Sequence, residues 1–212
     1  MTILLARGGS AFDGMYLGDI VLLIAGVVLF VVLLIAFLRQ IFTNRPYKGL
    51  LLFFFVPIVM IGWPVISQIK IGEGVAEIQK QTEAVQKNPQ DAQARGALEN
   101  QLRGLEQRPF KDPNTLATIG HAQFVLGNET AAQTNLQKAL AANPADLKAQ
   151  DLKKRIEVAN QLKSLTQEAE QQPANPQVKQ NLAIAVRQAD QLKLANPNAI
   201  QAVQKAKVVL AR

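Results

Sequence analysis

The amino-acid sequence predicts an all-α protein in which a two-helix transmembrane hairpin precedes a domain of short helices. Three observations support this prediction. Two uncharged apolar runs, at residues 20–38 and 50–69, approach the length of about 20 residues that a helix needs to cross a bilayer. From Ile71 onward, apolar residues recur at three- and four-residue spacing, as they do along one face of a helix. The same region is punctuated by Asn-Pro and Asp-Pro pairs, which are typical of helix starts.

The two apolar runs have the features of membrane spans. The first, IVLLIAGVVLFVVLLIAFL, is too long for a signal peptide and lacks a basic region before it. The second contains Pro57 and Pro64, which a membrane helix tolerates where its neighbours satisfy the freed carbonyl groups. Trp63 lies toward the far end of this run, where interfacial aromatic residues are common. We therefore expect residues 19–70 to form a membrane hairpin.

The link between the two runs determines the expected orientation. Residues 39–49 form a short loop that carries Arg39, Arg45 and Lys48. Positive charge in short loops marks the cytoplasmic side of a membrane. We therefore expect a cytoplasmic loop, with the N-terminal tail, residues 1–18, and everything after the second span outside the cytoplasm. In a Gram-negative bacterium this places both chain termini on the periplasmic side of the inner membrane.

The region from residue 71 to 212 is predicted to be a separate helical domain. It is rich in Ala, Gln, Asn, Lys and Glu and has no strand signals. Two stretches, beginning at Val75 and Val158, share a plan of three helices and indicate an internal repeat. Within the first, Gly127 is expected to end a helix and Asn128 to cap the next. The expected helix boundaries are Asn88-Pro89, Asp112-Pro113, Asn143-Pro144, Asn175-Pro176 and Asn196-Pro197.

One pair of predicted helices resembles the tetratricopeptide (TPR) repeat. The small residues Gly120 and Ala132 stand where that repeat brings its two helices close together, while Phe124 lies one place beyond the usual aromatic position. One repeat cannot bury its own faces, so the resemblance implies a degenerate TPR-like array of about three hairpins. The positions expected to pack in the TPR-like manner are Leu116, Ile119, Gly120, Phe124, Ala132, Leu136, Ala139 and Pro144.

The residue types present offer little for catalysis. The chain has no Cys and one His, His121, so thiolate chemistry and cysteine-ligated metal sites are excluded. No nucleotide-binding or hydrolase motif occurs, and the paired acids Glu168 and Glu170 lie in a Gln-rich helix without a histidine nearby. We expect no catalytic residue, no bound cofactor and no metal.

The charge distribution does not favour a nucleic-acid partner. From Ile71 onward the chain has 18 Lys and Arg against 14 Asp and Glu. The densest basic cluster, Lys153, Lys154 and Arg155, has no aromatic residues interleaved with it. We interpret the cluster as a solvated helix face; the alternative is contact with anionic lipid headgroups or an acidic partner.

Together these features predict a non-catalytic scaffold or accessory subunit. The expected partners are membrane subunits and lipid around the hairpin, and extrinsic subunits or a client peptide on the helical array. The architecture distantly resembles the membrane TPR protein of bacterial cytochrome c maturation, which has two spans, a long cytoplasmic loop and a periplasmic TPR region that holds apocytochrome. That resemblance implies an alternative, an assembly chaperone for an exported client such as an apocytochrome. A homo-oligomeric, membrane-organising scaffold is a third interpretation.

Overall fold

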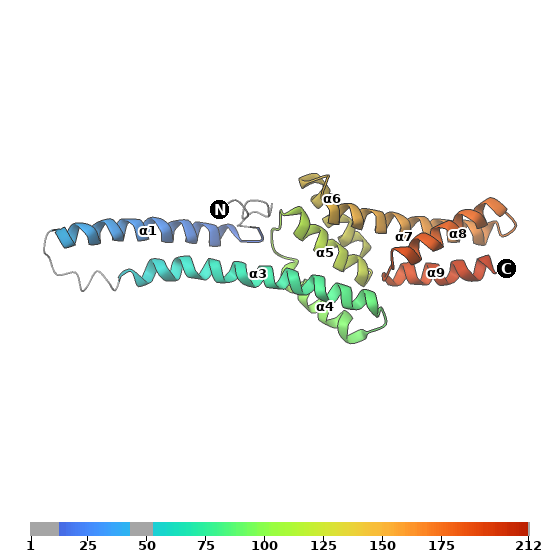
Figure 1. The fold of residues 1–212 in the computed structure, drawn as a ribbon, viewed down its shortest axis with the longest axis horizontal. Coiled ribbons are helices and arrows are strands. Elements are labelled where there is room, and N and C mark those ends of the chain that lie inside the picture. The colour runs from blue at the N-terminus through green and yellow to red at the C-terminus, as the bar shows by residue number, and fades with distance from the viewer. Residues whose placement is uncertain (1–12, 43–52, 212) are drawn as a thin grey trace. The chain divides into compact units, whose positions relative to one another are not determined.

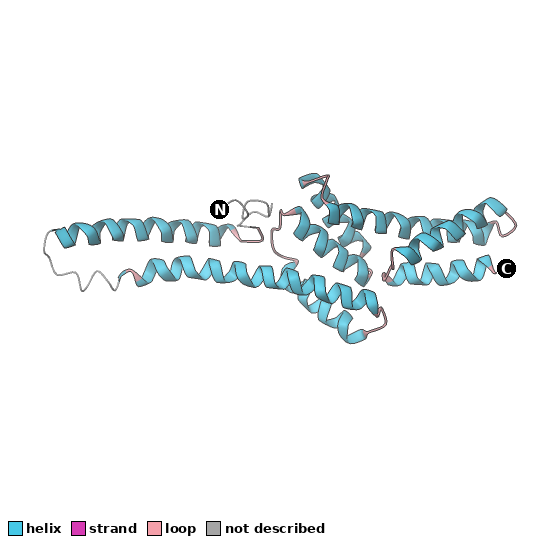
Figure 2. Cartoon of the chain, in the orientation of Figure 1, coloured by secondary structure: helices cyan, strands magenta, loops and turns pink. Residues whose placement is uncertain are grey.

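A computed structural model describes residues 13–42 and 53–211 (Figure 1). Within these ranges the chain forms eight α-helices and no strand (Figure 2), which confirms the all-α prediction. The helices are α1 (Leu17–Phe42), α3 (Phe55–Lys87), α4 (Ala92–Leu105), α5 (Pro113–Leu126), α6 (Glu129–Ala142), α7 (Leu147–Gln171), α8 (Pro176–Gln191) and α9 (Pro197–Leu210).

The described chain divides into two compact units. One contains residues 74–107 and 111–211 and is called the helical domain below. The other contains residues 13–73, apart from the undescribed 43–52, together with residues 108–110, and is called the hairpin unit. Helix α3 runs through residue 70 without a break, so the predicted start of the domain at residue 71 lies inside a helix.

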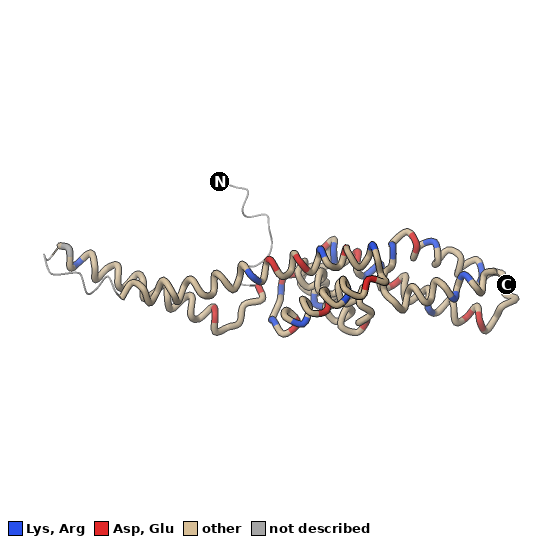
Figure 3. Tube along the Cα trace, turned by 90° about the horizontal axis from the view of Figure 1, so that it is seen from below, with Lys and Arg blue, Asp and Glu red and all other residues tan. Residues whose placement is uncertain are grey.

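Among the described residues, helices α1 and α3 are long and apolar enough to cross a membrane. They pack closely where a Cβ on Gly26 would lie 2.9 Å from Ile61 and 3.0 Å from Met60. The ring of Phe54 makes edge contacts with Phe30 and Phe37, at centroid separations of 5.6 and 5.9 Å. Most of their other large apolar side chains are exposed. Figure 3 shows few charges along α1 and the first part of α3, whereas the later helices carry both signs.

Near Gln68, the hairpin unit is held together by contacts between residues that are distant in sequence. The Gln68 amide donates to the backbone oxygen of Asp13 at 3.1 Å. Gly14 has a φ of +73°, and a Cβ there would overlap the ring of Phe110. The guanidinium of Arg108 lies 5.7 Å from the centroid of Tyr16, a cation–π distance. Within the hairpin unit, residues 108–110 therefore pack against the turn that precedes α1.

Three connections in the helical domain use one type of turn. Each is a four-residue turn with Pro at its second position. Its fourth residue is the N-cap of the next helix, and the backbone N–H of that residue donates to the carbonyl of the first residue. The turns are Asn88–Asp91, Asn143–Asp146 and Gln172–Asn175. All five predicted pairs lie at helix ends, but at Asn88-Pro89 and Asn143-Pro144 the proline lies in the turn and not in the first turn of the next helix. Asp91 and Asp146 cap those helices instead, because their carboxylates reach backbone N–H groups three residues on.

Helices α5 and α6 form an antiparallel hairpin that meets at small residues. A Cβ on Gly120 would lie 3.2 Å from the backbone oxygen of Ala132 and 2.9 Å from Leu152 of α7. Gly127 ends α5 at φ 96°, and the N–H groups of Gly127 and Asn128 bond the carbonyls of Phe124 and Gln123 in a Schellman arrangement. The expectation that Asn128 caps α6 was wrong, because its side chain makes no capping hydrogen bond.

We predict opposite effects of alanine at two helical glycines. Gly120→Ala pushes a methyl group toward the α6 backbone and lowers the free energy of unfolding by about 1–3 kcal/mol. Gly96→Ala, in α4 with nothing within 4 Å of the new Cβ, raises it by about 0.5–1 kcal/mol, because alanine has less backbone freedom to lose. Thermal unfolding of the full chain in detergent measures both, and equal shifts would show that α5 and α6 do not meet at Gly120.

The internal repeat extends over three helices in a constant register. Helix α5 begins at Pro113 and ends at Leu126, and α9 begins at Pro197 and ends at Leu210, so both ends are 84 positions apart. The same separation relates the N-caps Asp91 and Asn175. In this register Val75 is equivalent to Ala159. The sequence had suggested that the second copy begins one residue earlier, at Val158. Equivalent buried pairs are Ile78 and Leu162, Thr82 and Thr166, Leu98 and Leu182, and Ala122 and Ala206.

Asn196 joins the two copies of the repeat. Its side chain is 0% exposed and its Nδ2 donates to the carbonyl of Phe124 near the end of α5, at 2.7 Å. Its Oδ1 accepts from the backbone N–H groups of Asn198 and Ala199 and so caps α9. The equivalent cap in the first copy is Asp112. A carboxylate could not replace Asn196, because it has no N–H for the Phe124 carbonyl.

We therefore expect Asn196→Asp to destabilise the protein by about 2–4 kcal/mol, since it places a buried charge against a carbonyl oxygen. Asn175→Asp is the matched control: Asn175 also caps a helix before a proline, but its Nδ2 bonds only to Gln172 in an exposed position. That change should shift stability by less than about 0.5 kcal/mol, because Asp and Asn cap equally well. Comparable melting temperatures for the two variants would argue against the Asn196 joint.

Candidate partner-binding groove

A groove lies on the helical domain between α3 and α7, with α5 between them, and several polar side chains line it. Its first part is a cavity of about 330 Å³. Residues of α3 and α7 form its sides and residues of α5 contribute Ala117, Thr118 and His121. The remaining lining residues are Gln79, Thr82, Glu83 and Gln86 of α3, and Leu147, Lys148 and Asp151 of α7.

A second cavity of about 600 Å³ adjoins the first and shares Glu83 and Gln86 with it. Its further lining comes from the end of α3, the middle of α7 and the end of α8. These residues are Lys87, Arg155, Gln191, Leu192, Lys193 and Leu194. The two cavities form one continuous groove, to which α4, α6 and α9 contribute no lining residue.

Helical periodicity places the polar side chains in the groove. On α3, the buried residues Ile78, Thr82 and Val85 face the core. Gln79 and Gln86 follow on the adjacent face, seven positions apart, which corresponds to about 10 Å along a helix. The amphipathic pattern of α3 thus places the side-chain amides of Gln79 and Gln86 beside its buried face, where they line the groove.

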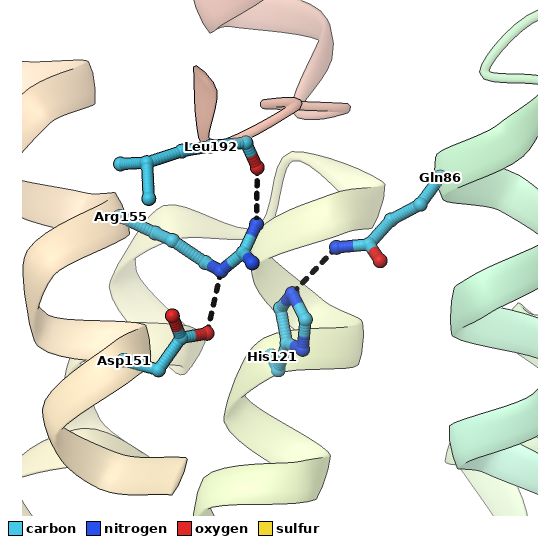
Figure 4. Close-up of polar contacts among 5 residues, drawn as sticks. All are labelled: Gln86, His121, Asp151, Arg155 and Leu192. Carbon is cyan, nitrogen blue, oxygen red and sulfur yellow. Dashed lines mark hydrogen bonds and ion pairs between the residues drawn. The ribbon is translucent and has the colours of Figure 1, made fainter. Parts of the chain in front are cut away.

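His121 lies in the groove beside Gln86, as Figure 4 shows. The Gln86 side-chain nitrogen is 2.9 Å from the imidazole Nε2. Because an amide nitrogen can only donate, Nε2 accepts and the ring proton sits on Nδ1. Burial and then the positive charge of Arg155 lower the pKa of His121 from 6.5 to about 4; Asp151 raises it and Lys148 lowers it further. The imidazole is therefore neutral near pH 7, and its pKa is poorly matched to acid–base catalysis at that pH.

Arg155 has a structural role. Its side chain is 17% exposed, its Nε donates to Asp151 at 2.6 Å and its Nη1 to the carbonyl of Leu192 at 2.7 Å (Figure 4). It thereby satisfies a backbone carbonyl just beyond the end of α8. Its neighbour Lys153 forms an exposed pair with Glu157. The basic cluster of the sequence is thus divided between the partly buried Arg155, which bonds to the end of α8, and the exposed Lys153.

None of the predicted TPR-like residues lines the groove, and two of them, Gly120 and Ala132, meet where α5 approaches α6. Those on α5 and α6 are buried, and Pro144 is exposed in the turn that follows α6. Arg39 lies in the last turn of α1, while Arg45 and Lys48 fall outside the described residues. The predicted α5 and α6 packing positions are Leu116, Ile119, Gly120, Phe124, Ala132, Leu136 and Ala139.

Sequence reasoning missed the groove residues Gln79, Gln86 and Lys148. The available signal was the pair of glutamines seven positions apart on an amphipathic helix. Nothing in the sequence brought Lys148 to them, because it lies on another helix and reaches Gln79 only through the packing of α7.

No metal site accompanies the groove in the part of the chain that the structure describes, where no three His, Cys, Asp or Glu side chains gather to hold an ion. Comparison with protein families, with curated proteins and with solved structures found no match to this chain.

Proposed function

We propose that this protein is a non-catalytic, membrane-anchored scaffold or accessory subunit whose groove binds and positions a segment of a partner protein. The observation that carries the proposal is helix α3. Its first part is apolar enough to cross a membrane, and its last turns supply Gln79, Glu83 and Gln86 to the groove. One uninterrupted helix thus belongs both to the anchor and to the binding surface.

The hairpin is proposed to span the inner membrane of a bacterium. Its exposed apolar side chains suit lipid or the helices of membrane subunits. With Arg39, Arg45 and Lys48 on the cytoplasmic side, both termini and the helical domain are periplasmic.

The orientation predicts opposite labelling of two single cysteines. Thr43→Cys should be protected from an impermeant thiol reagent in intact spheroplasts, and Asn128→Cys should react. The chain has no native cysteine, so each variant gives an unambiguous signal. Permeabilised cells provide the control for reactivity at Thr43, and the reverse labelling pattern would invert the topology.

The groove supports binding of an extended segment. Residues of α3, α5 and α7 line its first cavity, as the first helices of successive hairpins do in a TPR-like array. The Gln79 and Gln86 amides, about 10 Å apart along α3, match about three residues of an extended chain at 3.3 Å per residue. Side-chain amides both donate and accept, so they can pair with a partner's backbone.

The face of α5 that contains Gly120 is covered by α6. The equivalent face of α9 does not favour covering by a second copy of this chain. Where α5 has Ala117 and Gly120, α9 has the exposed residues Gln201 and Gln204. On α5 the absence of a side chain at Gly120 lets α6 pack closely. At the equivalent position of α9, the long polar side chain of Gln204 would block such an approach. This observation favours the subunit over the homo-oligomeric scaffold.

Co-purification in mild detergent tests the proposal. We expect a stoichiometric extrinsic partner that is lost when Gln79 and Gln86 are both changed to Ala. The matched control changes Gln133 and Gln137, which are exposed on α6, and should retain it. Sub-stoichiometric exported clients would instead support the assembly chaperone. Retention of every partner by the Gln79 and Gln86 variant would count against the groove.

A further inference from the structure

Lys148 is held in the groove without a carboxylate. Its Nζ donates to Oε1 of Gln79 at 3.0 Å and to Oγ1 of Thr118 at 3.3 Å. Both acceptors are neutral, and among the ion pairs of the described residues none includes Lys148. An ammonium group has three N–H donors, so one remains for a ligand.

The two acceptors are themselves held by further bonds. Thr118 Oγ1 donates to the carbonyl of Asn114 at 2.8 Å, which directs its lone pairs toward other donors. The Gln79 nitrogen lies 3.5 Å from Glu83 Oε1 and donates to it, so its oxygen faces Lys148. The ammonium is therefore positioned by groups from α3 and α5, before any ligand is present.

The surrounding charge is positive. The groove is lined by Lys87, Lys148, Arg155 and Lys193 and by only two acids, Glu83 and Asp151. Asp151 is bonded to Arg155, which leaves Glu83 as the acid without an Arg or Lys pair in the groove. Lys148 is also the second residue of α7, where the helix dipole adds positive potential.

We infer that Lys148, with Gln79 and Thr118, forms a subsite for a carboxylate group carried by an extended segment of a partner protein. The inference rests on the proposed function and specifies the chemistry of its ligand. A carboxylate accepts the spare N–H of Lys148 in a charge-assisted bond, which is about twice as strong as a neutral one. The rest of the segment follows Gln86 toward the second cavity.

Three synthetic peptides distinguish the source of the carboxylate. Acetyl-AAEAA-amide carries it on a side chain, acetyl-AAAAA with a free C-terminus carries it at the chain end, and acetyl-AAQAA-amide has none. Binding to the full chain in detergent micelles is measured by calorimetry. We expect at least one acidic peptide to bind about tenfold more tightly than the glutamine peptide. The preference should disappear in Lys148→Gln and persist in Lys154→Gln, an exposed position on the same helix.

The single histidine provides a second readout. With the purification tag removed, His121 is the only histidine in the chain, so its NMR signal needs no assignment. A carboxylate bound at Lys148 is a negative charge near His121, and it should raise the pKa of His121 above its value of about 4. The glutamine peptide should leave this pKa unchanged, which separates a charge effect from simple occupancy.

The outcomes separate this inference from the proposed function. Equal binding of all three peptides, or equal effects of Lys148→Gln and Lys154→Gln, would overturn the carboxylate subsite while leaving the groove as a binding site. If none of the three peptides binds, the carboxylate subsite is overturned and the result also counts against the groove as a binding site.

Discussion

The helical domain depends on one buried side chain, that of Asn196, which ends one helix and begins another. A helix leaves unpaired carbonyls at its end and unpaired N–H groups at its start. Asn196 satisfies both kinds at once, for α5 and for α9, at a position with no exposed surface. Because this position is closed to water, any packing that separated these helix ends would leave the same backbone groups unpaired, and Asn196 therefore favours the arrangement that brings the helix ends together.

Two further polar contacts hold neighbouring helix ends. Asn198 donates to Glu129 at the start of α6, and Arg155 of α7 donates to the carbonyl of Leu192 after α8. Helix α7 is shared, because its first half packs with α5 and its second half forms the core with α8 and α9. The position of α7 relative to α5 is therefore determined by both copies, and this position brings Lys148 to Thr118.

The two copies have diverged where their surroundings differ. Core positions keep their character, as Leu98 and Leu182 show, and both Thr82 and Thr166 bond the carbonyl four residues earlier at 2.7 Å. The face that is covered in α5 is open in α9, and there Gly120 is matched by Gln204. The paired His121 and Gln86 belong to the first copy alone, because their positions are matched by Lys205 and Glu170 in the second copy.

Local features can be predicted from the sequence: the apolar runs, the 3.6-residue periodicity, Gly127 as a helix end and the small residues of the α5–α6 contact. These follow from interactions between residues near one another in the chain. Tertiary structure decided which residues cap the helices after two of the proline turns, how far α3 extends, and which polar groups meet in the groove. Gln79, Thr118 and Lys148 lie on three helices, and only the packing of those helices brings the three side chains together.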